Sequence, residues 1–95
     1  MSTDFHSGLV LSLTELVGDY GAKIGNAPLT LVSYNVLALE LLGFLRSGSL
    51  TLVNGNWDAI SNVCTFVLGY LLGERFSRQQ YIGLALITVG LFLIQ

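Results

Sequence analysis

Four apolar segments separated by short polar breaks make up most of this 95-residue chain. They run over residues 8–24, 29–45, 50–72 and 80–94. A helix needs about 20 residues, with a range near 17–25, to cross roughly 30 Å of hydrocarbon. The first three segments are long enough, and the fourth would require local bilayer thinning or cover from a neighbour. Only 11% of the residues are charged, against about 25% in soluble domains. We therefore expect a single domain over residues 1–95, an all-α membrane protein of four transmembrane helices.

A soluble four-helix bundle is the alternative to four membrane helices. Such a bundle would require a polar face on every helix, and residues 81–94 have almost no polar side chains. The first break, Gly25 to Pro28, follows the usual order, because glycine and asparagine end helices and proline starts them. The positive-inside rule weakly favours placing Lys23, Arg75 and Arg78 on the cytoplasmic side. We expect a multi-pass protein of the plasma or inner membrane, with lipid around it.

Several functional classes are excluded by composition and motifs. The net charge is −2 and there is no basic tail, which excludes a nucleic-acid partner. Cys64 is the single cysteine, so no disulfide can form within the chain. Motifs for nucleophilic hydrolysis, redox chemistry, phosphate binding and metal coordination are lacking, so we expect neither an enzyme nor a cofactor or metal. The segment Met1–Ser7 has no lysine or arginine, unlike a secretory signal, and we expect the first apolar segment to be retained.

One face of the first segment carries a polar stripe of Ser12, Glu15, Asp19 and Lys23. These residues fall within a sector of about 80° on a helix. A carboxylate at this depth costs roughly 3 kcal/mol and commonly marks a site for protons or cations. Lys23 follows Asp19 by one turn and is its expected salt-bridge partner, which makes Glu15 the expected proton carrier. The alternative is that Glu15 is a buried, hydrogen-bonded carboxyl that ties helices together.

The third segment has a second stripe, in which Asn54, Asp58, Ser61 and Thr65 share a face beside Trp57. Such side chains either bond between helices or line an aqueous pathway. The indole of Trp57 offers a π face to a cation, or it anchors the helix at the membrane interface. We expect Asn54, Trp57 and Asp58 to line the pathway together with Ser12, Glu15 and Asp19.

Two further features concern how the helices are held together. Glu40 lies near the end of the second segment, where we expect its carboxylate to reach the membrane interface or to pair with Arg46. The spacings Gly21-x-x-x-Gly25 and Gly69-x-x-x-Gly73 permit close helix contact, either within the chain or between subunits. Four helices of this size enclose little of a pathway alone, so a second copy or a related subunit is the expected cover.

Parts of the chain resemble a known family. The stretch 14–18, TELVG, is followed by Lys23, and Trp57 lies on the third segment. Residues 72–77, LGERFS, precede YIG at 81–83 and ITVG at 87–90. Over about residues 9–94 this pattern resembles the small multidrug resistance (SMR) transporters, within the drug/metabolite transporter superfamily. The resemblance implies four helices, an antiparallel homodimer or a heterodimer, and alternating access. It also implies that the carboxylate at Glu15 binds either a proton or a cationic substrate.

The chain differs from the family pattern around Trp57 and in its acids. Asp58 replaces a small residue after the tryptophan, Asn54 replaces an aromatic one turn before it, and Asp19 and Glu40 are additional. More acids and amides indicate a smaller or more polar ligand than an aromatic drug. The leading hypothesis is a proton-coupled exporter of a small cationic or polar compound. The alternatives are a non-transporting accessory subunit of a larger membrane complex and, more weakly, half of a heteromeric lipid-carrier flippase.

Overall fold

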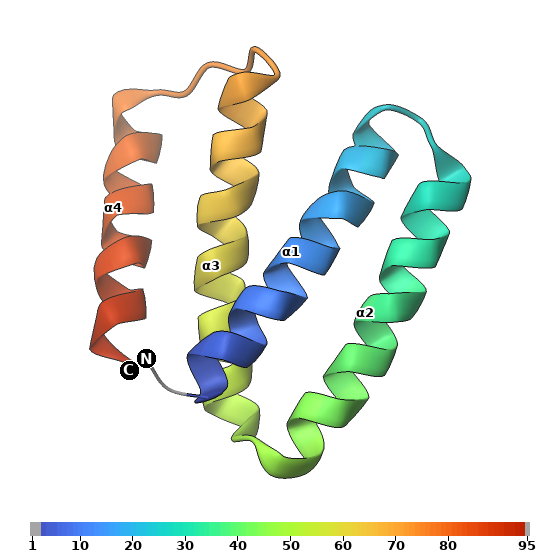
Figure 1. Ribbon diagram of the computed structural model, residues 1–95. Coiled ribbons are helices and arrows are strands. Elements are labelled where there is room, and N and C mark those ends of the chain that lie inside the picture. Colours follow the sequence, from blue (N-terminus) through green and yellow to red (C-terminus); the bar gives the residue numbers. More distant parts are fainter. Residues whose placement is uncertain (1–2, 95) are drawn as a thin grey trace.

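The computed structural model describes residues 3–94, which form four helices joined by short turns (Figure 1). They are α1 (Thr3–Lys23), α2 (Ala27–Ser47), α3 (Leu50–Leu71) and α4 (Arg78–Leu93). The predicted all-α fold is confirmed. Helix α1 begins five residues before the apolar segment does, because polar residues extend a helix beyond its apolar part and Asp4 suits its first turn. Within the Met1–Ser7 segment, the first two residues lie outside the described part of the chain.

Both helical hairpins turn on a glycine with positive φ. Gly25 has a φ of 76° and Gly73 a φ of 98°, which a residue without a Cβ adopts at no steric cost. The backbone N–H of Asn26 donates to Gly21 O at 2.8 Å, and the backbone N–H of Glu74 donates to Gly69 O at 3.0 Å. This is the Schellman pattern of a helix C-terminus. The two glycine spacings noted in the sequence thus each combine a helical glycine with a turn glycine.

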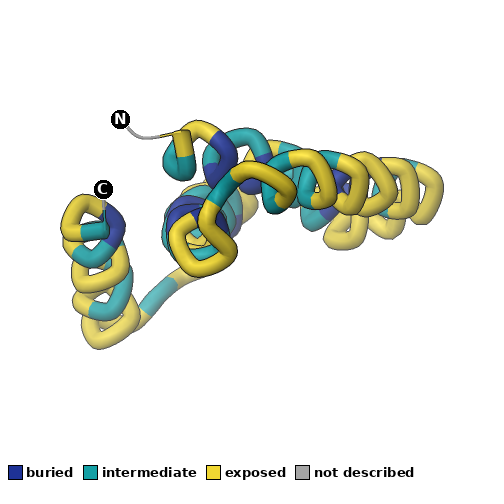
Figure 2. The backbone as a smooth tube through the Cα atoms, turned by 90° about the horizontal axis from the view of Figure 1, so that it is seen from below, coloured by how far each residue is buried: buried dark blue, intermediate teal, exposed yellow. Residues whose placement is uncertain are grey.

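The helices form a row in the order α4, α3, α1 and α2 (Figures 1 and 2). Contacts between α1 and α3 advance in the same direction along both helices, from Gly8 beside Asn56 to Glu15 beside Ser61. These two helices therefore run in the same direction, and α2 and α4 run back along the outside. The molecule measures 39 × 35 × 16 Å, so it is a slab not much thicker than one helix with its side chains.

Glycines of α1 set how closely the helices approach. A Cβ on Gly8 would lie 2.8 Å from Asn56 Cβ and from the Trp57 backbone nitrogen. A Cβ on Gly21 would lie 2.9 Å from Thr30 Oγ1 of α2. Small residues at these positions let α1 pack tightly against a helix on each side.

The hydrophobic core is small, and many large apolar side chains are exposed. Buried residues take up only short parts of the tube in Figure 2. Leu11, Leu37 and Val53 form the buried cluster, against which Trp57 and Phe44 pack. By length and composition, α2 is the one described helix able to cross a membrane. Helix α4 has only 16 residues, and polar side chains lower the hydropathy of α1 and α3. The finding supports one spanning helix, whereas four spans stay a prediction.

Candidate functional site

The polar stripe of α1 faces α3 over its central turns. Ser12 is fully buried and its hydroxyl donates to the Trp57 carbonyl at 3.1 Å. One turn further, the Ser61 hydroxyl donates to Glu15 Oε1. Two polar pairs thus join the parallel helices at successive turns, and Glu15 lies at a helix–helix contact, half-buried. Proton binding by Glu15 and a tie between helices are both compatible with this position.

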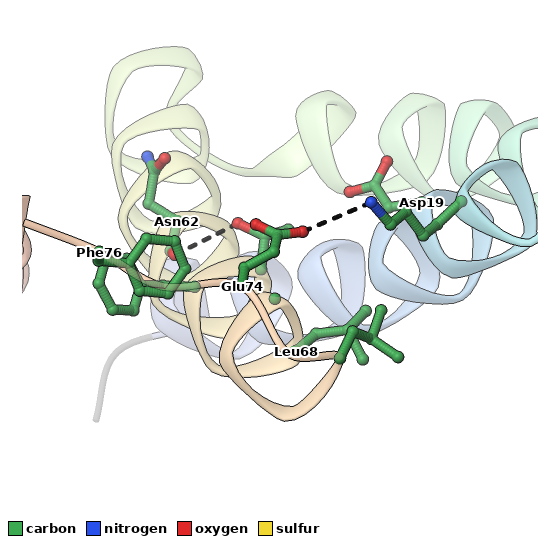
Figure 3. Close-up of a pocket in the computed structure, with 10 residues that line it drawn as sticks. Asp19, Asn62, Leu68, Glu74 and Phe76 are labelled. Carbon is green, nitrogen blue, oxygen red and sulfur yellow. Dashed lines mark hydrogen bonds and ion pairs between the residues drawn. The ribbon is translucent and has the colours of Figure 1, made fainter.

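Beyond Glu15, α1 and α3 diverge around a cavity of about 430 Å³ (Figure 3). Asp19 and Lys23 line it from α1, one and two turns after Glu15. Helix α3 and the following loop complete a wall that mixes polar, aromatic and aliphatic side chains: Asn62, Thr65, Phe66, Leu68, Gly69, Leu72, Glu74 and Phe76. The cavity can therefore contact both charged and apolar parts of one ligand.

Asp19 and Lys23 do not form the salt bridge expected from their spacing. Tyr34 of α2 donates its hydroxyl to Asp19 Oδ1. Lys23 Nζ instead lies 3.7 Å from Glu74 Oε2 in the α3–α4 loop, the ion pair drawn in Figure 3. Tertiary packing overrides the local i,i+4 preference, because α2 and the loop bring partners to the two side chains from opposite sides.

Glu40 does not pair with Arg46 either. Its Oε2 lies 3.1 Å from the Thr14 hydroxyl, which also approaches the Val10 carbonyl at 3.1 Å. Glu40 Oε1 is buried without a hydrogen-bond partner among the described residues. Arg46 is exposed at the end of α2. Glu40 turns inward because its position on α2 faces α1, whereas Arg46 lies at the helix end, where its side chain reaches outward.

The three residues of α3 expected in the pathway do not line the cavity. The Trp57 ring packs on the core cluster, with Nε1 buried and unpartnered within the described chain. The Asn54 amide donates to Leu50 O of its own helix at 2.8 Å. Asp58 is exposed in the middle of α3. Of the six predicted pathway residues, Asp19 alone lines the cavity, with Glu15 one turn away.

Two residues at the site were not predicted from the sequence. Tyr34 reaches Asp19 across the α1–α2 interface, and no spacing in the chain indicates that register. Glu74 had a usable signal, since it is the first charged residue after the third apolar segment and follows the turn glycine Gly73. A chain that reverses there returns Glu74 towards the end of α3, close to where α1 also ends.

The arrangement can exchange a proton or a cation at Glu15 and hold a ligand in the adjoining cavity. Ser61 can donate to an ionised Glu15 or accept from a protonated one, so either state has a partner. No cluster of three metal-ligating side chains occurs among residues 3–94. Comparisons with protein-family models, curated proteins and solved structures yield no match. The site's function is therefore inferred from its own geometry.

Proposed function

We propose that this protein spans the membrane four times and exchanges protons for a small cationic or polar compound. The first support is the exposed apolar surface of the outer helices. Exposed side chains include Leu31 and Leu39 of α2, at 64% and 69%, and Leu86 and Leu93 of α4, at 68% and 80%. Contiguous apolar surface on this scale is uncommon on soluble monomers. Ser12 and Glu15 of α1 face α3, and Thr14 and Asp19 face α2, so these polar groups lie between helices rather than on the outer surfaces of α2 and α4.

A second copy, or a related subunit, covers the slab in this proposal. Asp58 is exposed near the middle of α3, where contact with lipid would cost several kcal/mol in the charged form. Among the described residues, α1, α3 and the following loop line the cavity, and its open side is covered from outside this chain in the proposal. A dimer supplies both a polar environment for Asp58 and the remaining wall.

The observation that carries the transport proposal is the position of Glu15 at the α1–α3 contact, one turn from a mixed polar and apolar cavity. A carboxylate binds either a proton or a cation, so the two compete for the same oxygen atoms. Entry of a cation therefore releases a proton, and the energy of one gradient is coupled to movement of the other. Asp19, a carboxylate that lines the cavity one turn after Glu15, attracts the cation towards this position.

Proton release measures this competition directly. The purified protein in weakly buffered detergent is mixed with phenethylammonium, a small cation with an apolar ring. We expect wild-type protein to release protons in a saturable manner, and Glu15→Gln to release almost none. Glu40→Gln is the matched control, because Glu40 is also a half-buried helical acid but contacts Thr14 between α1 and α2, not the α1–α3 contact that holds Glu15. Equal release from wild type and Glu15→Gln would contradict the assignment.

An accessory-subunit role is the second candidate, supported by the same uncovered surface, since any partner could cover it. Cross-linking in native membranes distinguishes the two roles. A homodimer as the sole cross-linked species supports transport, and reproducible cross-links to unrelated membrane proteins support the accessory role.

A further inference from the structure

The cavity has a cationic group at one side and a carboxylate one turn below it on the same helix. Lys23 and Asp19 are four residues apart, a spacing that places side chains about 5–6 Å apart at Cβ. Both line the cavity, yet they do not pair with each other. Opposite charges that lie side by side without pairing with each other can contact the two ends of a dipolar ligand.

The carboxylate of Glu74 lies beside Lys23, where the carboxylate of a ligand could bind instead. The loop amide of Glu74 is fixed to Gly69 O at 3.0 Å, and its carboxylate folds over Gly69. A Cβ added to Gly69 would lie 2.9 Å from Glu74 Oε1, so the glycine leaves room for this carboxylate. Phe76 in the same loop stacks against Phe66, with ring centroids 4.0 Å apart. The loop thus brings a carboxylate to Lys23 in a defined position.

The pair between Lys23 and Glu74 is easily exchanged. Its two atoms are 3.7 Å apart, and the side chains are 60% and 48% exposed. Exposed ion pairs contribute little to stability, so another carboxylate can replace Glu74 at small cost. Asp19 keeps one carboxylate oxygen, Oδ2, that accepts no hydrogen bond from Tyr34.

We propose that the cavity and the adjoining Glu15 bind an amphipathic zwitterion, whose ammonium group lies between Asp19 and Glu15 and whose carboxylate displaces Glu74 from Lys23. The apolar part of the ligand lies against Phe66, Leu68 and Phe76, which line the opposite wall. An amino acid with a large apolar side chain has this chemistry and fits a volume of about 430 Å³. The inference rests on the proposed function, because it names the substrate class of the same site.

Three compounds that share a phenyl ring test the proposal. Phenylalanine carries both charges, phenethylammonium lacks the carboxylate, and 3-phenylpropionate lacks the ammonium. Binding is measured by calorimetry on the full-length protein in detergent. We expect phenylalanine to bind about 1.5-fold to fivefold more tightly than phenethylammonium, the range of an exposed ion pair, and 3-phenylpropionate to bind most weakly.

Substitutions of the ion pair give a second readout. Glu74→Gln frees Lys23, so the preference for phenylalanine over phenethylammonium should rise severalfold. Lys23→Gln should abolish the preference. When Lys23→Gln is already present, adding Glu74→Gln should change the ratio of the two affinities much less than Glu74→Gln does alone. The reason is that Glu74→Gln acts by releasing Lys23. Arg78→Gln is the control, because this arginine begins α4 and does not line the cavity.

The outcomes separate this inference from the proposed function. Phenethylammonium binding with Glu15-dependent proton release, but no gain from the carboxylate, would overturn the zwitterion assignment and leave the exchange proposal intact. A preference for phenylalanine that survives Lys23→Gln would also overturn it. Binding of none of the three compounds would overturn the inference, and absent proton release would contradict the proposed function as well.

Discussion

The contact between Gly8 and α3 allows a quantitative prediction about the central helix pair. In Gly8→Ala, the new Cβ would meet the Trp57 backbone nitrogen at 2.8 Å and Asn56 C at 2.9 Å. Backbone atoms cannot rotate away as a side chain can, so α1 and α3 must separate. Overpacking of this kind costs about 1–3 kcal/mol, and alanine regains up to about 1 kcal/mol of helix propensity. We expect a net loss of about 1–2 kcal/mol in unfolding free energy.

Gly43→Ala is the matched control. Gly43 lies within α2, and a Cβ there would meet nothing within 4 Å. The propensity gain is common to both variants, so the difference between them isolates the steric cost, about 1–3 kcal/mol. Both are unfolded by titration of dodecyl sulfate into mild detergent. The fluorescence of Trp57, the single tryptophan, reports on the contact itself. The reasoning is refuted if Gly8→Ala is as stable as Gly43→Ala.

Two further stability predictions concern hydrogen bonds. Thr14→Val removes the hydroxyl beside Glu40 Oε2 and should lower the unfolding free energy by about 1–3 kcal/mol. Combining it with Glu40→Leu should restore stability. The same loss in this double variant would contradict a role for the Thr14–Glu40 pair. Thr88→Val, whose hydroxyl bonds only its own helix, is the control for the hydroxyl itself. Ser77→Ala removes the capping box of α4 and should lower the unfolding free energy by about 1 kcal/mol. The loss is measured from helicity followed on heating, and an unchanged melting temperature would refute the contribution of the cap.

The sequence was sufficient to predict the helical fold and most helix ends. Gly25 and Asn26 before Pro28, and Gly73 after the third segment, act locally, so their effect can be read from neighbouring residues. The parallel packing of α1 on α3 could not be read in this way. It depends on a glycine at position 8 meeting α3 nearly fifty residues later, and the sequence contains many glycines of similar appearance.

The site was predicted less completely than the fold. The α1 stripe identified Glu15 and Asp19 because helical periodicity places them on one face. The partners were not predictable in the same way, since Tyr34 and Glu74 come from elements whose register is set by tertiary contacts. Trp57 packs on the core cluster rather than lining the cavity, because it lies one turn after the buried Val53 on the same edge of α3.

The thinness of the molecule has a consequence for how its ligand preference would evolve. A slab of 39 × 35 × 16 Å provides only part of the enclosure around its own cavity, and in the proposed dimer the second chain completes the remainder. Selectivity then belongs to the pair rather than to either chain. A substitution on the covering surface of a partner could alter which compound is accepted while every residue described above stayed unchanged.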